Sequence, residues 1–116
     1  MVKTKSVYSV PDENDGLRVL VTRYWPRGIR KEAQDYWIRD LGPEPTLIKK
    51  WKAGEIEWAE FERAYMEEFR KDARKRELLS ELKSIIKTAR KDVTLLCTCK
   101  EDEPCHRKLL KEMLRR

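Results

Sequence analysis

Three cysteines and the single histidine of the chain lie close together near its C-terminus. The cluster consists of Cys97, Cys99, Cys105 and His106, and Arg107 follows directly. Thiolates and imidazoles act as nucleophiles, exchange protons and bind zinc. The cluster therefore offers nucleophilic or redox catalysis, metal binding or disulfide formation.

A catalytic role would make Cys105 the nucleophile and His106 the acid or base. Cys105 is expected in the first turn of a helix, where the positive helix end lowers the pKa of a thiol. The cations His106 and Arg107 act in the same direction. Acidic residues directly upstream oppose this effect, namely Glu101, Asp102 and Glu103.

Zinc binding and structural roles are the alternatives for the same residues. Cys97, Cys99, Cys105 and His106 suffice for a tetrahedral zinc site, but the paired Cys-x-x-Cys spacing of common zinc sites is absent. A disulfide between Cys97 and Cys105 is another alternative. Cysteines are also among the most buried residues, and a histidine in line with an apolar helical stripe can pack against a backbone carbonyl.

A second cluster with chemical potential spans Arg23-Tyr24-Trp25-Pro26-Arg27-Gly28. Arg23 and Arg27 can each hold a phosphate or carboxylate through two hydrogen bonds, and Trp25 offers a ring face for stacking. The structural alternative is that Trp25 covers the core while the arginines pair with acids such as Glu32 and Asp35.

Two apolar runs rich in β-branched residues position these clusters. Leu17–Thr22 precedes the arginine cluster, and Val93–Cys97 leads into the cysteines. A weaker strand is predicted over Ser6–Val10, at an edge of the sheet and ended by Pro11.

Helical spacing dominates the rest of the chain. Apolar residues recur at this spacing along two segments, which begin at Trp58 and Leu78. The segment from Asp35 to Trp51 is broken by glycine and prolines and predicts two short helices, the second capped by Thr46. A last helix is predicted from about Pro104 to Arg115.

This order predicts an α/β fold in a chain long enough for one domain over residues 1–116. We expect a single compact domain with a small, mostly parallel sheet of two or three strands, flanked by helices. The expected order is two strands, of which Ser6–Val10 is the weaker, then three helices, a strand and a last helix. Because ligands bind at the carboxyl ends of parallel strands, the two clusters meet if their strands are neighbours.

The charge balance favours an anionic partner. Lys plus Arg number 27 against 21 Asp plus Glu, which gives a net charge of +6. Basic runs such as Arg74-Lys75-Arg76 are interleaved with acids at helical spacing and predict solvated faces, with a nucleic-acid groove as the alternative.

Composition also bears on location and source. No apolar run is long enough to cross a bilayer and the N-terminus lacks the apolar stretch of a signal peptide, so we expect a cytoplasmic protein without a membrane partner. Asn14 and Gln34 are the only amides, and with the many charged residues this is typical of a protein from a hot environment. The sequence indicates no oligomeric state.

The run Asp15–Val21, the element Trp25-Pro26-Arg27-Gly28 and the end Cys105-His106-Arg107 together resemble domain-of-unknown-function family 488, in particular its YeaO-like branch. The resemblance covers nearly the whole chain, and Trp-Pro-Arg-Gly is its most specific part. It implies one compact α/β domain of intracellular bacterial or archaeal type and no established activity.

Two departures from the family pattern bear on the chemistry. Thr22 stands where the pattern has Asp before the arginine, which removes a carboxylate acid or base from that position. Many YeaO-like relatives have other residues where this chain has Cys97 and Cys105, whereas other branches end in Cys-His-Arg. A reaction shared by the whole family would therefore depend on the arginines rather than on thiols.

We therefore expect a small enzyme or binder of an anionic, phosphate-bearing ligand at the strand ends. Arg23, Arg27 and Arg107 would hold the ligand, Trp25 would stack on it, and the cysteine–histidine cluster would supply nucleophilic or acid–base chemistry. The alternatives are a nucleic-acid-binding module, whose affinity would fall with salt, and a zinc-stabilised interaction domain.

Overall fold

The structure is a computed structural model that describes residues 1–99 and 104–115. Its strands are β1 (Val2–Ser6), β2 (Leu17–Leu20), β3 (Tyr36–Trp37) and β4 (Val93–Cys97). Its α-helices are α1 (Pro45–Lys52), α2 (Trp58–Lys71), α3 (Ala73–Thr88) and α4 (His106–Arg115). Short 3-10 helices are η1 (Glu13–Asp15), η2 (Lys31–Ala33) and η3 (Arg39–Leu41). Within this described part, no helix is both long and apolar enough to cross a membrane.

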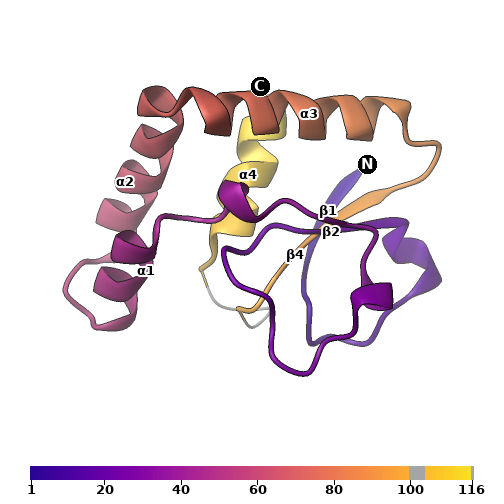
Figure 1. Cartoon of the computed structure of the whole chain (residues 1–116), viewed down its shortest axis with the longest axis horizontal. Coiled ribbons are helices and arrows are strands. Elements are labelled where there is room, and N and C mark those ends of the chain that lie inside the picture. The colour runs from indigo at the N-terminus through magenta and orange to yellow at the C-terminus, as the bar shows by residue number, and fades with distance from the viewer. Residues whose placement is uncertain (100–103, 116) are drawn as a thin grey trace.

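The four strands form one parallel sheet in the order β1-β4-β2-β3. All residues of the central strand β4 are buried, and Val93 pairs with both Val2 and Leu17. Parallel strands need a crossover connection, which α1, α2 and α3 supply on the way to β4 (Figure 1). The prediction that the two main strands are parallel neighbours is confirmed.

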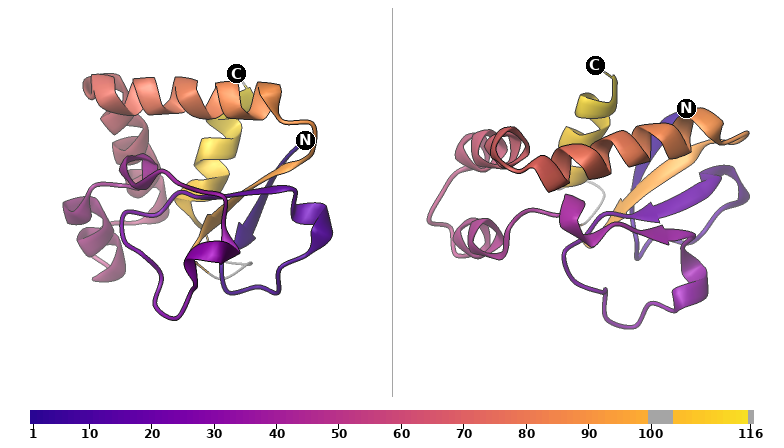
Figure 2. Two further views of the ribbon diagram at one scale, coloured as in Figure 1. Left: turned by 45° about the vertical axis from the view of Figure 1, so that its right-hand side comes forward. Right: turned by 45° about the horizontal axis from the view of Figure 1, so that its top comes forward.

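Alternation along the strands divides the apolar core between the two faces of the sheet. Leu95 of β4 belongs to a large cluster with apolar side chains from all four α-helices. Leu96 points to the opposite face, where it packs with Leu20 beneath Trp25 and Ile29. Figure 2 shows the helices on one side of the sheet and the coil between β2 and β3 on the other. The predicted α/β domain with a small sheet flanked by helices is confirmed.

Two features of the sheet differ from the prediction. The strand expected over Ser6–Val10 was misplaced, because β1 covers Val2–Ser6, although it does lie at an edge of the sheet. Lys3 and Lys5 conceal this strand in the sequence, and their amino groups reach the 3-10 helix η1. The two-residue strand β3 was not predicted, since its residues are exposed and pair only with β2.

The helices agree with the sequence more closely. The stripes that begin at Trp58 and Leu78 lie on α2 and α3, which meet at Asp72. The carboxylate of Asp72 caps α3, because it accepts a hydrogen bond from the backbone N–H of Arg74 at 2.9 Å. The two short helices expected before Trp51 are η3 and α1. The cap assigned to Thr46 was wrong, because α1 begins one residue earlier, at Pro45, whose fixed φ suits a first helical position.

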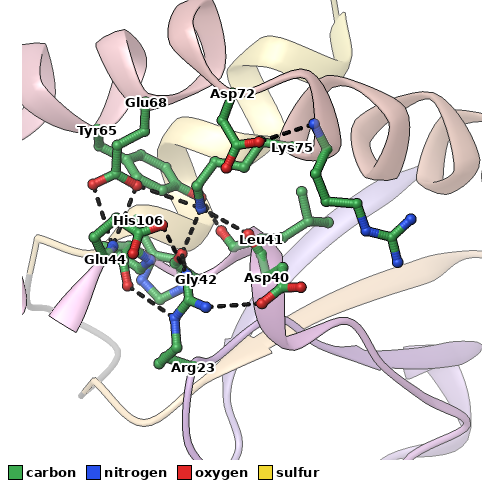
Figure 3. A network of polar contacts seen from close by, with 12 residues as sticks. Arg23, Asp40, Leu41, Gly42, Glu44, Tyr65, Glu68, Asp72, Lys75 and His106 are labelled. Carbon is green, nitrogen blue, oxygen red and sulfur yellow. Dashed lines mark hydrogen bonds and ion pairs between the residues drawn. The ribbon is translucent and has the colours of Figure 1, made fainter.

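The solvated face predicted for Arg74-Lys75-Arg76 is wrong for Lys75, whose side chain is 1% exposed. Its amino group donates to the carbonyl oxygens of Asp40 and Gly42, each at 2.7 Å, and lies 3.4 Å from a carboxylate oxygen of Glu68 (Figure 3). Burial lowers the pKa of Lys75. The buried ammonium thereby joins α3 and α2 to the turn that follows η3.

Gly16 fixes the start of β2. Its φ of 67° lies in the left-handed region, and an added Cβ would come 1.9 Å from the carbonyl oxygen of Asp92. The same oxygen accepts a hydrogen bond from the backbone N–H of Leu17 at 2.8 Å. Glycine at this position therefore lets β2 and the segment before β4 approach closely.

Candidate functional site

A pocket of about 270 Å³ lies at the carboxyl ends of β2 and β4. Residues from both sequence clusters line it, namely Arg23, Trp25, Arg27, Cys99, Cys105 and His106. The clusters meet because each follows one of two adjacent parallel strands. This is the edge of a parallel sheet at which ligands commonly bind.

Aromatic rings from α1 and α2 form much of the pocket wall. The ring of Trp58 stacks on Phe61 with centroids 5.0 Å apart, and Trp51 meets Trp58 edge-on at 5.4 Å. The exposed residues Tyr8 and Tyr24 also line the pocket. Trp51 and Trp58 also pack against the apolar core. Their helical spacing gives no signal that their remaining surface faces a pocket.

The three cysteine thiols form one cluster, of which Cys99 and Cys105 line this pocket. Their Sγ atoms all lie within 4.8 Å of one another, and all three cysteines are free. Cys97 is fully buried at the end of β4, Cys105 is almost fully buried before α4, and Cys99 is half-buried. Such spacing is close enough for the thiols to hold a metal ion. The disulfide considered between Cys97 and Cys105 is not formed in the structure.

Arg107 lies behind the thiols and does not line the pocket. Its guanidinium is fully buried and donates to Cys97 Sγ at 2.6 Å and to the carbonyl oxygen of Cys99 at 3.1 Å. Arg107 therefore lies beside the thiols, as the sequence predicted. Its side chain contacts Cys97 and Cys99 and does not border the pocket.

The three thiols differ in acidity. Hydrogen bonds from the thiols of Cys105 and Cys97 lower the pKa of Cys99, and the nearby charge of Arg107 lowers it further. Burial raises the pKa of Cys97. A hydrogen bond with Cys97 lowers the pKa of Cys105, but its hydrogen bond to Cys99 and its burial outweigh this and raise the pKa to about 11.

The sequence predicted a lowered pKa for the thiol of Cys105. In the structure it is the pKa of Cys99 that is lowered, whereas the pKa of Cys105 is raised. Once Cys99 is ionised, a second thiolate beside it is disfavoured by repulsion between like charges. Glu101, Asp102 and Glu103, which were expected to raise the pKa of Cys105, lie outside the described residues.

His106 connects the thiols to the tip of β2. Its Nε2 lies 2.6 Å from the carbonyl oxygen of Val21, and its Nδ1 lies 3.6 Å from Cys105 Sγ. Burial lowers the pKa of His106 to about 4, so the ring is neutral at pH 7. The Nε2–H then donates to the carbonyl oxygen of Val21, and the unprotonated Nδ1 faces the sulfur of Cys105. His106 thus combines the predicted structural contact with a position in the pocket wall.

The lowered pKa of His106 predicts a loss of stability in acid. The unfolded chain binds a proton near pH 6.5, whereas the folded chain binds it only near pH 4. The contribution of His106 to stability therefore falls as the pH drops through this interval, by about 2 kcal/mol between pH 7 and pH 5. Urea unfolding at the two pH values measures the total loss of stability, which should be about 2 kcal/mol smaller in His106→Gln. An equal loss in both proteins would show that His106 does not titrate on unfolding.

The two arginines of the first cluster have different surroundings. Arg23 pairs with Asp40 at 2.8 Å and Glu44 at 3.4 Å, and also donates to the carbonyl oxygen of Gly42 at 3.0 Å (Figure 3). Pairing with acids was the structural alternative, although these are not the acids that the sequence suggested. Arg27 is exposed beside the pocket, and its carbonyl oxygen accepts from the hydroxyl of Tyr8 at 3.2 Å.

Trp25 has a mixed role. It is half-buried over the apolar cluster below it, and its Nε1–H donates to the carbonyl oxygen of Ile29 at 2.9 Å. Its ring meets that of Trp37 edge-on with centroids 5.1 Å apart, and it also lines the pocket. Gly28 adopts a φ of 81°, so this glycine occupies the left-handed region in the loop after Trp25. Trp25 therefore covers part of the core, as the structural alternative predicted.

The fold and the strand-end pocket define a small parallel α/β domain with a thiol cluster at its candidate site. The chain belongs to the DUF488 family, since residues 2–116 match the family model described as the active DUF488-N3 subclade.

Relatives from several bacteria match over almost their whole length. The uncharacterized protein YeaO of Escherichia coli K12 is 29% identical over 116 residues, which cover 98% of this chain and 96% of YeaO. The uncharacterized protein Rv3073c of Mycobacterium tuberculosis H37Rv is 34% identical over 115 residues, which cover 97% of this chain and 92% of that protein. No solved structure matches the chain significantly.

Proposed function

We propose that the protein is an enzyme that uses the thiolate of Cys99 as a nucleophile on a small anionic ligand bound in the strand-end pocket. The observation that carries the proposal is the cluster of three thiols, in which Cys99 lines the pocket and is the most exposed.

The neighbours of Cys99 suit nucleophilic catalysis. The thiols of Cys97 and Cys105 and the guanidinium of Arg107 stabilise a single thiolate at Cys99, and a thiolate is the nucleophilic form of cysteine. Cys105 keeps its proton and is hydrogen-bonded to Cys99. When Cys99 attacks and displaces a leaving group, the single thiol proton of Cys105 can pass to that group and leave Cys105 as a thiolate.

The pocket walls indicate the kind of ligand. The rings of Trp51 and Trp58 offer apolar surface to a planar or apolar body, and Arg27 and Lys52 provide exposed cations for an anionic group such as phosphate. Arg23 contributes less to ligand charge, because Asp40 and Glu44 already neutralise it. In this proposal the anion contacts Arg27 rather than Arg107.

A pair of alkylating reagents tests the preference for anions. Iodoacetate carries a negative charge and iodoacetamide does not, so the ratio of their rates at Cys99 reports the local potential. We expect Arg27→Ala combined with Lys52→Ala to lower this ratio about three- to tenfold at low salt. Arg30→Ala combined with Lys49→Ala is the matched control, because both residues are exposed and outside this pocket. If both double variants keep the wild-type ratio, the anionic ligand is excluded while the reactivity of Cys99 stands.

Zinc binding is a second candidate, favoured by the separation of at most 4.8 Å among the three Sγ atoms. Zinc binds thiolates at about 2.3 Å, and a site with three protein ligands leaves one position open for water or substrate. His106 is not needed as a ligand, since its Nε2 faces Val21. If zinc is resident, protein purified without chelator contains one equivalent and its thiols react faster after chelation. Unchanged thiol reactivity after chelation, together with the absence of metal, would exclude zinc binding and leave the thiol enzyme as the proposed function.

Nucleic-acid binding stays a proposal supported by the net charge of +6. A shallow groove along α4 adjoins the pocket through Trp58, Pro104 and Cys105, and basic side chains also line it. If this groove follows a phosphate backbone, affinity for single-stranded oligonucleotides should fall steeply with salt. Salt-independent binding, or none at low salt, would exclude this function.

A further inference from the structure

The thiol cluster contains more sulfur than a single nucleophile needs. All three cysteines are free, and each Sγ lies within 4.8 Å of the other two. Formation of a disulfide needs a thiolate that an oxidant can reach and a second thiol beside it. Both conditions are met within this cluster.

Cys99 is the sulfur that an oxidant in the pocket reaches first. Its side chain is half-buried and lines the pocket, whereas Cys97 is completely buried and Cys105 is 2% exposed. Exposure and thiolate character together decide which cysteine is oxidised. The same properties that suit Cys99 to nucleophilic attack therefore direct oxidation to it.

Cys105 is better placed than Cys97 to react with an oxidised Cys99. Cys97 Sγ is held by the guanidinium of Arg107 at 2.6 Å and by the backbone N–H of Cys99 at 3.4 Å, deep at the end of β4. Cys105 lines the same pocket as Cys99 and comes six positions later in the chain. A disulfide to Cys97 would instead close a very short ring between residues two positions apart, which conflicts with the preferred disulfide geometry.

We propose that hydrogen peroxide converts Cys99 and Cys105 into a reversible disulfide, which switches off the nucleophile. The inference rests on the proposed role of Cys99 and adds its regulation. In the first step the Cys99 thiolate attacks one peroxide oxygen, the O–O bond breaks, and the departing hydroxide takes up the proton that Cys99 had released. Cys99 is then a sulfenic acid and one water has formed.

In the second step the Cys105 sulfur attacks the Cys99 sulfur and the S–O bond breaks. The departing hydroxide leaves as water with the Cys105 proton, so two thiols and one hydrogen peroxide give one disulfide and two waters. A dithiol reverses the reaction by thiol–disulfide exchange. Cys97 keeps its thiol throughout.

The test exposes reduced, chelator-treated protein to equimolar hydrogen peroxide at pH 7. We expect the intact mass to fall by two hydrogens, the free thiols to fall from three to one, and digestion to release a peptide pair joined by Cys99 and Cys105. A small dithiol should restore all three thiols. Persistence of three thiols after peroxide, or a disulfide that contains Cys97, would overturn the inference.

Serine variants assign the two roles. Cys105→Ser keeps a hydrogen-bond donor beside Cys99 but lacks the second thiol, so it should gain one oxygen and react with dimedone, a reagent for sulfenic acids. Cys99→Ser should consume peroxide at least about tenfold more slowly, and Cys97→Ser should still form the disulfide. If Cys99 is alkylated readily but forms no disulfide, the inference fails and the proposed function stands. If Cys99 is also inert to alkylation, both fail.

Discussion

Cys99→Ser is expected to slow alkylation of the protein by iodoacetamide at pH 5 at least about a hundredfold. The reason is that Cys99 is the one thiol of the cluster whose pKa is lowered, whereas the pKa values of Cys97 and Cys105 are raised. The latter two thiols are also almost fully buried. Intact-mass measurements over time give the rate, and peptide mapping identifies the modified cysteine.

The matched control for this prediction is Cys97→Ser, which makes the same change at a neighbouring thiol. The serine hydroxyl can still donate toward Cys99, so the reaction at pH 5 should stay within a few-fold of the wild-type rate. Modification of Cys105 in the wild-type protein, or an unchanged rate in Cys99→Ser, would show that the nucleophile has been assigned to the wrong sulfur.

Lys75→Met is expected to destabilise the protein by about 3–5 kcal/mol, because it removes one partner of a buried ion pair. The substitution leaves Glu68 half-buried without its cation and leaves two carbonyl oxygens without the Lys75 ammonium. Those carbonyls belong to Asp40 and Gly42, which also bind Arg23 beside the pocket. Urea unfolding at pH 7 measures the change in the free energy of unfolding.

Lys83→Met provides the comparison on the same helix, since Lys83 is exposed. It should change stability by no more than about 0.5 kcal/mol. Similar small effects of both substitutions would mean that the ammonium of Lys75 contributes little to holding the turn after η3.

The sequence was sufficient to predict the elements in which apolar residues recur at a regular spacing. Apolar runs of five or six residues revealed β2 and β4, and helical spacing revealed α2, α3 and α4, because burial of one face imposes these periods. The short edge strand β3 has no such signal, since its residues Tyr36 and Trp37 are exposed and depend on pairing with β2. The lysines of β1 likewise conceal a strand whose backbone pairs with β4.

The candidate site was predictable in location but not in the role of each side chain. Both clusters follow parallel strands, so their approach at one edge could be inferred. The neutralisation of Arg23 could not, because Asp40 and Glu44 come from a turn whose path depends on the buried Lys75. The lowered pKa of Cys99 could not be predicted either, because it depends on the distances among three sulfur atoms, which the spacing of the cysteines in the sequence does not give.

The alkylation rate of Cys99 in the wild-type protein as a function of pH shows whether this thiol is the nucleophile. Peptide mapping at each pH keeps the rate specific to this residue. A lowered pKa predicts a rate that stays nearly level from pH 8 down to pH 5, because the thiolate persists throughout. A rate that instead falls about tenfold for each pH unit below pH 8 would be that of an ordinary thiol and would contradict the assignment of Cys99 as the nucleophile.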